Sequence, residues 1–165
     1  MVMTISTGAN AGLTSATESG PCTRVSIDPR GPRFGGAITT VVLAIALITM
    51  GTAFGTAVIA WQTIVFALGA FVGLRAQPYG WLFRTFIQPR LPAPAELEDS
   101  APPRFAQLVG FGFLAVALVA ALLGGTLVST IAVAFAIVAA FLNAAFNFCL
   151  GCEVFILAKR LTRSN

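Results

Sequence analysis

The stretch LVSTIAVAFAIVAAFLNAAFNF, residues 127–148, contains no charged residue. At a rise of about 1.5 Å per residue, a helix of this length crosses the hydrocarbon core of a bilayer, which is about 30 Å thick. Three further uncharged runs of nearly this length occupy residues 36–54, 56–74 and 105–123. The sequence therefore predicts four membrane-spanning helices.

The composition also indicates an integral membrane protein. Of the 165 residues, 57% are hydrophobic and only 10% are charged, and the mean hydropathy is +0.89. Soluble domains carry about 25% charged residues, so that class is excluded. The breaks near residues 51–55 and 124–126 are short and uncharged. We therefore predict an all-α, four-helix transmembrane bundle made of two tight helical hairpins.

The basic residues predict how the bundle is oriented. None of them lies in the two short hairpin turns. By the positive-inside rule, the segments that carry Lys and Arg face the cytoplasm and the two turns face the other side. We expect a multi-pass protein of the bacterial inner (plasma) membrane with both termini in the cytoplasm. Residues 1–27 are rich in Ser, Thr, Gly and Ala and are predicted to be a disordered cytoplasmic tail, whereas residues 28–165 form a single membrane domain. The basic residues are Arg24, Arg30, Arg33, Arg75, Arg84, Arg90, Arg104, Lys159, Arg160 and Arg163.

The chain contains an internal repeat with one constant offset. DPRGPRF at residues 28–34 returns as DSAPPRF at residues 99–105, and LAIAL at 43–47 returns as LAVAL at 114–118. We interpret this as a tandem duplication of the two-helix hairpin. Because each unit has two spans, the two halves share one orientation and are related by an axis along the membrane normal.

The repeat also predicts the structure of the segment that follows the second helix of each hairpin. The same offset aligns residues 78–81, PYGW, with residues 149–152, CLGC. Proline interrupts a helix, so Pro78 should end the second span, and the mixed apolar and polar residues 78–90 are suited to lie in the membrane interface. By analogy, we expect the fourth span to bend near Gly151 and to continue as an interfacial helix over residues 150–160.

The candidate reactive residues are Cys149 and Cys152, which stand in a C-x-x-C spacing. At a helix start, backbone amides favour a thiolate, so Cys149 is the candidate nucleophile and Cys152 its resolving partner. Glu153 is a third candidate as proton acceptor, although its charge also opposes thiolate formation. The alternatives are two inert small residues and a Glu153 that reaches the interface or pairs with an arginine. A permanent disulfide is disfavoured in the reducing cytosol.

Polar and small residues inside the spans have a structural and a functional interpretation. Asn143 and Asn147 should face the interior of the bundle. They either form hydrogen bonds between helices, which we favour, or line a path for a polar substrate. The same two interpretations apply to Gln62 and Gln107. Small residues let helices approach closely, either within the bundle or between two copies in a homodimer. They are Gly69 and Gly73 on the second span, and Ala132, Ala136, Ala140 and Ala144 on the fourth.

Missing residue types narrow the chemistry further. The chain has no histidine, which excludes imidazole bases, histidine-ligated haem and Cys/His zinc sites. Cys149 and Cys152 supply only two of the four ligands of a thiolate metal site, and Cys22 lies in the predicted tail. We therefore expect no cofactor, no metal and no nucleic acid.

Four segments resemble the bacterial membrane family catalogued as domain of unknown function 4395. They are DPRGPRFGGAITTVVLA (28–44), PYGWLFRTFIQPRL (78–91), PAELEDSAPPRFAQLVG (94–110) and, most specifically, FLNAAFNFCLGCE (141–153). The resemblance covers nearly everything after the tail. It implies about four spans and a C-x-x-C carried by Cys149 and Cys152. It also implies thiol or sulfur handling, because genes of the family often neighbour those of thioredoxins and sulfurtransferases.

Three functional hypotheses follow. The first is a membrane thiol module in which Cys149 attacks a disulfide or a sulfane sulfur and Cys152 resolves it, with a cytosolic thioredoxin-like or rhodanese-like protein as partner. The second is a noncatalytic accessory that stabilises a membrane complex. The third is a carrier of a small anion such as thiosulfate past Asn143 and Asn147, against which the lack of charge within the spans weighs.

Overall fold

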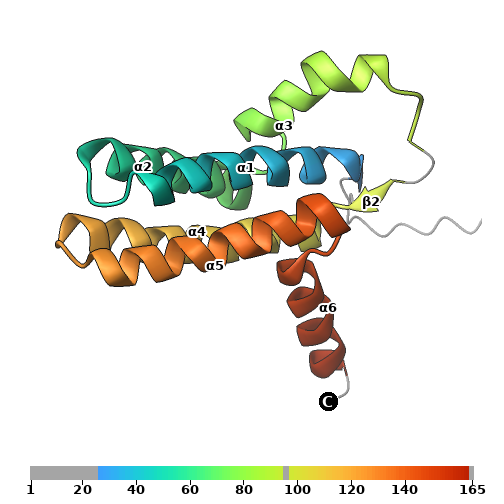
Figure 1. The fold of residues 1–165 in the computed structure, drawn as a ribbon. Helices are drawn as coiled ribbons and strands as arrows, with labels where there is room; N and C mark the ends of the chain where they lie inside the picture. The colour runs from blue at the N-terminus through green and yellow to red at the C-terminus, as the bar shows by residue number, and fades with distance from the viewer. Residues whose placement is uncertain (1–25, 95–96, 164–165) are drawn as a thin grey trace, which may run out of the picture.

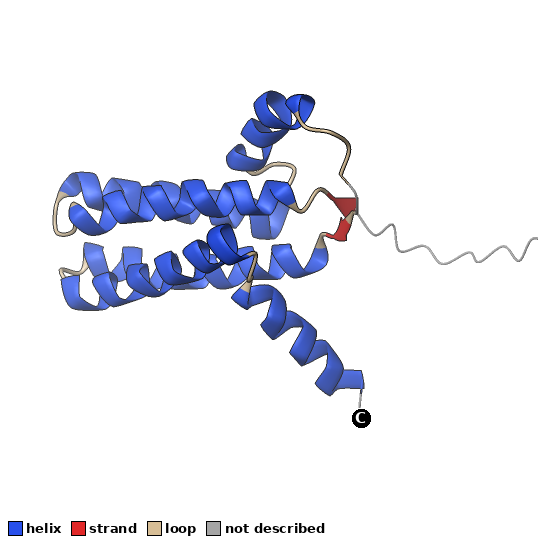
Figure 2. Ribbon diagram, turned by 45° about the vertical axis from the view of Figure 1, so that its right-hand side comes forward, coloured by secondary structure: helices blue, strands red, loops and turns tan. Residues whose placement is uncertain are grey.

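The computed structural model describes residues 26–94 and 97–163, so the predicted tail with Cys22 lies almost wholly outside the described part. Four long helices run side by side and form a bundle (Figures 1 and 2). Each is long and apolar enough to cross a membrane, which confirms the predicted all-α membrane fold. The helices are α1 (Arg30–Ile48), α2 (Ala53–Ala67) extended by the π-helical turn η1 (Leu68–Val72), α4 (Ala101–Leu122) and α5 (Thr126–Phe146).

An aspartate stands two residues before the first helix of each hairpin, and its side chain accepts from the first backbone amide of that helix. Oδ1 of Asp28 accepts a hydrogen bond of 2.9 Å from the Arg30 amide, and Oδ1 of Asp99 accepts one of 3.0 Å from the Ala101 amide. The two pairs are related by the offset of the repeat, so the repeated Asp-x-x-x-Pro-Arg-Phe motif is the start of a helix. The hydrogen bond from the Arg30 amide to Asp28 satisfies a free amide of the first turn, and α1 begins there, before the uncharged run that starts at residue 36.

The two hairpins pack around an approximate two-fold axis. α1 contacts α2 and α5, and its equivalent α4 contacts α5 and α2. A rotation that places each hairpin on the other therefore reproduces the same helix contacts. At one end of the bundle, β1 (Ser26–Ile27) pairs antiparallel with β2 (Glu98–Asp99). Ile27 lies opposite Glu98, its own equivalent in the second repeat, which places the axis through this pair. The observed packing is that of a duplicated hairpin.

The core is narrow and is formed where the four helices meet. Leu43 and its equivalent Leu114 are fully buried together with Ile59 and Val133. The small residues of α5 serve this packing: Ala132, Ala136 and Ala140 are buried. A Cβ on Gly36 of α1 would lie 3.2 Å from the Ala140 carbonyl oxygen, so α1 and α5 touch along their backbones.

Buried amides join the helices of the first hairpin. Gln62, fully buried, donates from Nε2 to Oγ1 of Thr39 at 3.2 Å and accepts at Oε1 from the Tyr79 hydroxyl at 2.8 Å. Tyr79 also accepts from the Trp61 indole at 3.3 Å. The equivalent of Gln62 in the second hairpin is Val133, so this network belongs to one repeat alone. Interhelical hydrogen bonding is the observed role of Gln62.

The third segment of each repeat lies at the bundle end that carries β1 and β2 (Figure 1). In the first repeat it consists of α3 (Pro78–Leu82), the π-helical turn η2 (Phe83–Ile87) and the 3-10 turn η3 (Gln88–Arg90); in the second it is α6 (Leu150–Arg163). The second span ends before Pro78, at Gly73 with φ 125°, and Pro78 begins α3 as its first residue. The proline therefore starts a helix here, as its fixed φ favours.

Candidate functional site at the start of α6

The chain leaves α5 through a left-handed residue. Asn147 has φ 56° and ψ 26° and ends the helix, and Phe148 and Cys149 follow before α6 begins at Leu150. The break predicted near Gly151 lies a few residues earlier, at residues 147–149, and α6 begins at Leu150 as predicted. Asparagine adopts the left-handed conformation more readily than other residues with a Cβ, which explains why the break falls there.

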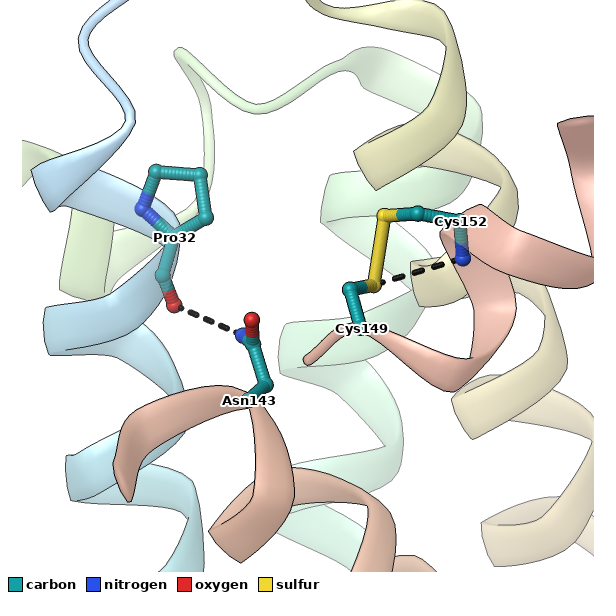
Figure 3. The surroundings of a disulfide bond; sticks show 4 residues. All are labelled: Pro32, Asn143, Cys149 and Cys152. Atoms are coloured by element: carbon teal, nitrogen blue, oxygen red, sulfur yellow. Dashed lines mark hydrogen bonds between the residues drawn. A yellow bond between two sulfur atoms is a disulfide. The ribbon is translucent and has the colours of Figure 1, made fainter. Parts of the chain in front are cut away.

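Cys149 is the residue immediately before α6 and caps it. Its Sγ accepts a hydrogen bond of 3.3 Å from the backbone amide of Cys152 (Figure 3), and its carbonyl oxygen accepts one of 3.0 Å from the Glu153 amide. The amides of a first helical turn have no partner within the helix and carry partial positive charge. A thiolate on Cys149 would therefore be stabilised by the helix start.

Cys149 and Cys152 are joined as a disulfide in the structure (Figure 3). Their Cα atoms are 5.2 Å apart, inside the range of about 4.4–6.8 Å that a disulfide spans without backbone movement. Both side chains are partly exposed, and their neighbours Phe148 and Leu150 are exposed. The sulfur atoms lie beyond the end of the fourth spanning helix, at the edge of the bundle.

Gly151, between the two cysteines, seats α6 on α4. A Cβ at this position would lie 2.6 Å from the Cα of Ala106 and 2.7 Å from its Cβ, closer than real side chains approach. One turn later, the rings of Phe155 and Phe105 pack with centroids 5.6 Å apart. The glycine thus lets the C-x-x-C segment contact a spanning helix directly, a role that the sequence did not reveal.

Glu153 lies in the first turn of α6 and is exposed. Its contact with Cys149 is made by its backbone amide. A negative side chain in a first helical turn stabilises the helix dipole. The structure therefore brings the three predicted site residues together at the start of α6, with Glu153 exposed.

The two asparagines near the site have different roles. Nδ2 of Asn143 donates to the carbonyl oxygen of Pro32 at 3.3 Å and ties α5 to α1 (Figure 3), which is the expected interhelical bond. Asn147 is exposed, so the expectation that it faces the interior is wrong. In the sequence, only its position at the end of an apolar run, just before the cysteine pair, indicated that a helix ends at Asn147.

No group of three or more His, Cys, Asp or Glu residues lies close enough to hold a metal ion anywhere in the ranges 26–94 and 97–163. Cys149 and Cys152 are the soft ligands present at the site.

Comparison with known proteins gives one match. A family model described as Domain of unknown function (DUF4395) matches residues 27–160, which run from β1 through most of α6 and include Cys149 and Cys152. No curated protein and no solved structure matches the chain.

Proposed function

We propose a function for this chain, which belongs to the family described as Domain of unknown function (DUF4395). The Cys149–Cys152 pair acts as a thiol–disulfide relay at the membrane surface, in which Cys149 attacks and Cys152 resolves. The observation that carries the proposal is the hydrogen bond from the Cys152 amide to Sγ of Cys149 at the helix start. It distinguishes the two sulfur atoms, because one caps the helix and the other lies within its first turn.

The reaction conserves atoms and electrons. The Cys149 thiolate attacks one sulfur of a partner's disulfide, a mixed disulfide forms, and the partner's second sulfur leaves as a thiolate that takes up a proton. Cys152 gives its proton to water and attacks Sγ of Cys149, which forms the internal disulfide and releases the partner's first sulfur. The partner gains two electrons, and the pair of cysteines loses two.

The same attack handles a sulfane sulfur. The Cys149 thiolate would take the terminal sulfur of a partner's persulfide, leaving a persulfide on Cys149 and a thiolate on the partner. Attack by Cys152 on Sγ of Cys149 then releases hydrosulfide and closes the internal disulfide. Glu153, exposed in the same turn, is the proposed acceptor of the Cys149 proton.

The charge distribution supports a cytoplasmic location for the site. In the described chain, the lysine and arginine residues lie at the bundle end that carries α6, whereas the turns at residues 49–52 and 123–125 contain no charge. By the positive-inside rule, we place this end and both termini in the cytoplasm of a bacterium, at its inner membrane. A thioredoxin-like or rhodanese-like protein of the cytosol would then reach the pair.

α6 supports a location at the membrane surface. One face of the helix is apolar and exposed, whereas Lys159 and Arg160 occupy another part of its circumference. A helix of this kind lies in the interface with its apolar side toward lipid. The apolar residues are Leu150, Val154, Leu157 and Leu161.

The proposal is tested by trapping the mixed disulfide. Cells carry Cys152→Ser in a Cys22→Ser background, so that Cys149 attacks but cannot be resolved. We expect a covalent adduct with a protein of thioredoxin or rhodanese type. The matched control is Cys149→Ser in the same background, which keeps one thiol in the same turn. Equal adducts in the two variants, or none in either, would contradict the assigned roles.

A further inference from the structure

A second candidate site lies in the first repeat, where the structure has a cavity of about 220 Å³. It is bounded by the start of α1, the segment that follows η1, the helix formed by α3 and η2, and the start of α4. Its polar lining consists of Asp28, Arg75, Gln77, Arg84, Gln88 and Gln107. These residues are distinct from the cysteine pair.

The two-fold axis relates this cavity to the cysteine site. Gly80, in its wall, is the equivalent of Gly151 in the second repeat. There, Gly151 fits against Ala106 and fills the space. In the first repeat, the counterpart of Ala106 is Gly35, where an added Cβ would still lie 4.0 Å from the Cβ of Tyr79. The space therefore stays open in one half and is closed in the other.

The open half has also exchanged aromatic for polar residues. Arg75, Gln77 and Arg84 occupy the places of Phe146, Phe148 and Phe155. In the second repeat, the corresponding space is closed by the contact of Gly151 with Ala106 and by the packing of Phe155 on Phe105, whereas Phe146 and Phe148 are exposed. The difference between the two halves therefore indicates a ligand for the polar half.

A pair of glutamine amides forms the inner part of the lining. Gln77 is only 6% exposed, and its Nε2 donates to Oε1 of Gln107 at 3.1 Å. That bond uses one N–H of Gln77 and leaves the amide group of Gln107 with donors to offer. These remaining donors face the cavity and can bind a ligand that carries acceptor oxygens.

The charged residues favour an anion. Nη2 of Arg84 donates to the Arg75 carbonyl oxygen at 2.6 Å, which fixes the guanidinium and leaves its other N–H groups free of that contact. Asp28 is the acidic residue in the lining, and its Oδ1 already accepts from the Arg30 amide. Two arginines against one aspartate give the lining a net charge of +1.

We propose that this cavity, the Arg75–Arg84 pocket, binds a tetrahedral oxyanion. The guanidinium fork matches the oxygens of phosphate-like groups, and the volume lies below the range of about 300–1,000 Å³ that suits larger ligands. The oxyanion is either the phosphate of a phospholipid headgroup or a free inorganic ion. The inference is independent of the thiol relay and survives if that proposal fails.

The test measures binding to the full chain in dodecyl maltoside by isothermal titration calorimetry at constant ionic strength. The probes are dihexanoyl phosphatidylglycerol and inorganic phosphate. Arg75→Gln is the principal variant: Arg75 is exposed and its one observed hydrogen bond is accepted by its backbone carbonyl, so the fold is kept. Arg90→Gln is the matched control, because Arg90 is exposed at the same bundle end but outside the lining.

We expect saturable binding of at least one probe and a Kd about tenfold weaker or more in Arg75→Gln, with little change in Arg90→Gln. If phosphate displaces the lipid, the site recognises the oxyanion itself; if only the lipid binds, it recognises a headgroup. Both results support the pocket. Failure of both probes to bind the wild type, or equal weakening in Arg90→Gln, would overturn it.

Discussion

Gly151→Ala tests how the cysteine segment is held on the bundle. The added Cβ would lie 2.6 Å from the Cα of Ala106 and 2.7 Å from its Cβ. Carbon atoms pack at about 3.5–4.0 Å, so α6 must withdraw from α4 by about 1 Å. That displacement also separates Phe155 from Phe105, whose ring centroids are 5.6 Å apart.

The two energetic effects of this substitution have opposite signs. Overpacking of a tight contact costs about 1–3 kcal/mol. Replacing glycine by alanine within a helix contributes about 0.5–1 kcal/mol in the other direction. The contact with Ala106 is one of backbone against backbone, which cannot relax by a rotamer change, so overpacking wins. We expect a net loss of about 1–2 kcal/mol in the free energy of unfolding.

The assay is reversible unfolding in SDS followed by circular dichroism, with Gly112→Ala as control. Gly112 lies inside α4, and a Cβ there would meet no atom within 4 Å. The control should therefore be as stable as the wild type or slightly more stable, because only the helix-propensity effect remains. Gly151→Ala that is no less stable than Gly112→Ala would refute the close contact between α6 and α4.

Three further predictions use the same unfolding assay. Asn147→Val should lower the free energy of unfolding by about 1–2 kcal/mol, because valine is strained at the φ of 56° found here. Asn147→Gly should not lower it, and equal losses in the two variants would contradict the left-handed helix end. Burial raises the pKa of Tyr79 above its usual 10.0, so folding favours the neutral phenol and stability falls as the pH rises past this value; a fall unchanged in Tyr79→Phe would exclude this phenol as the cause. Asp28→Ala and Asp99→Ala should each lower the free energy of unfolding by about 1 kcal/mol, and a large difference between them would argue against equivalent helix starts in the two repeats.

The spanning helices and the duplication could be predicted from the sequence because both depend on local patterns. A long uncharged run predicts a helix that crosses the membrane. The Asp-x-x-x-Pro-Arg-Phe motif precedes the first helix of the hairpin in both repeats. The same locality placed Cys149 close to a helix start, where the structure has it.

The contacts between helices could not be predicted, because they depend on which faces meet. Gln62 and Tyr79 lie on different helices and meet only after the chain reverses beyond Gly73. Gly151 looked like a place to bend, yet its observed role is a contact with Ala106 on a distant part of the chain. Asn147 looked like a polar residue for the interior, and it instead ends α5 by adopting a conformation that hydropathy does not encode.

The proposed relay requires that the start of α6 make Cys149 the more nucleophilic of the two thiols. The most direct measurement compares alkylation by iodoacetamide of Cys149 in Cys152→Ser with that of Cys152 in Cys149→Ser, both in a Cys22→Ser background and over a range of pH. We predict that Cys149 reacts faster than Cys152. As the pH is raised, the rate for Cys149 should reach its plateau at a pH below the usual thiol pKa of about 8.5. Equal rates, or faster reaction of Cys152, would show that the start of α6 does not activate Cys149.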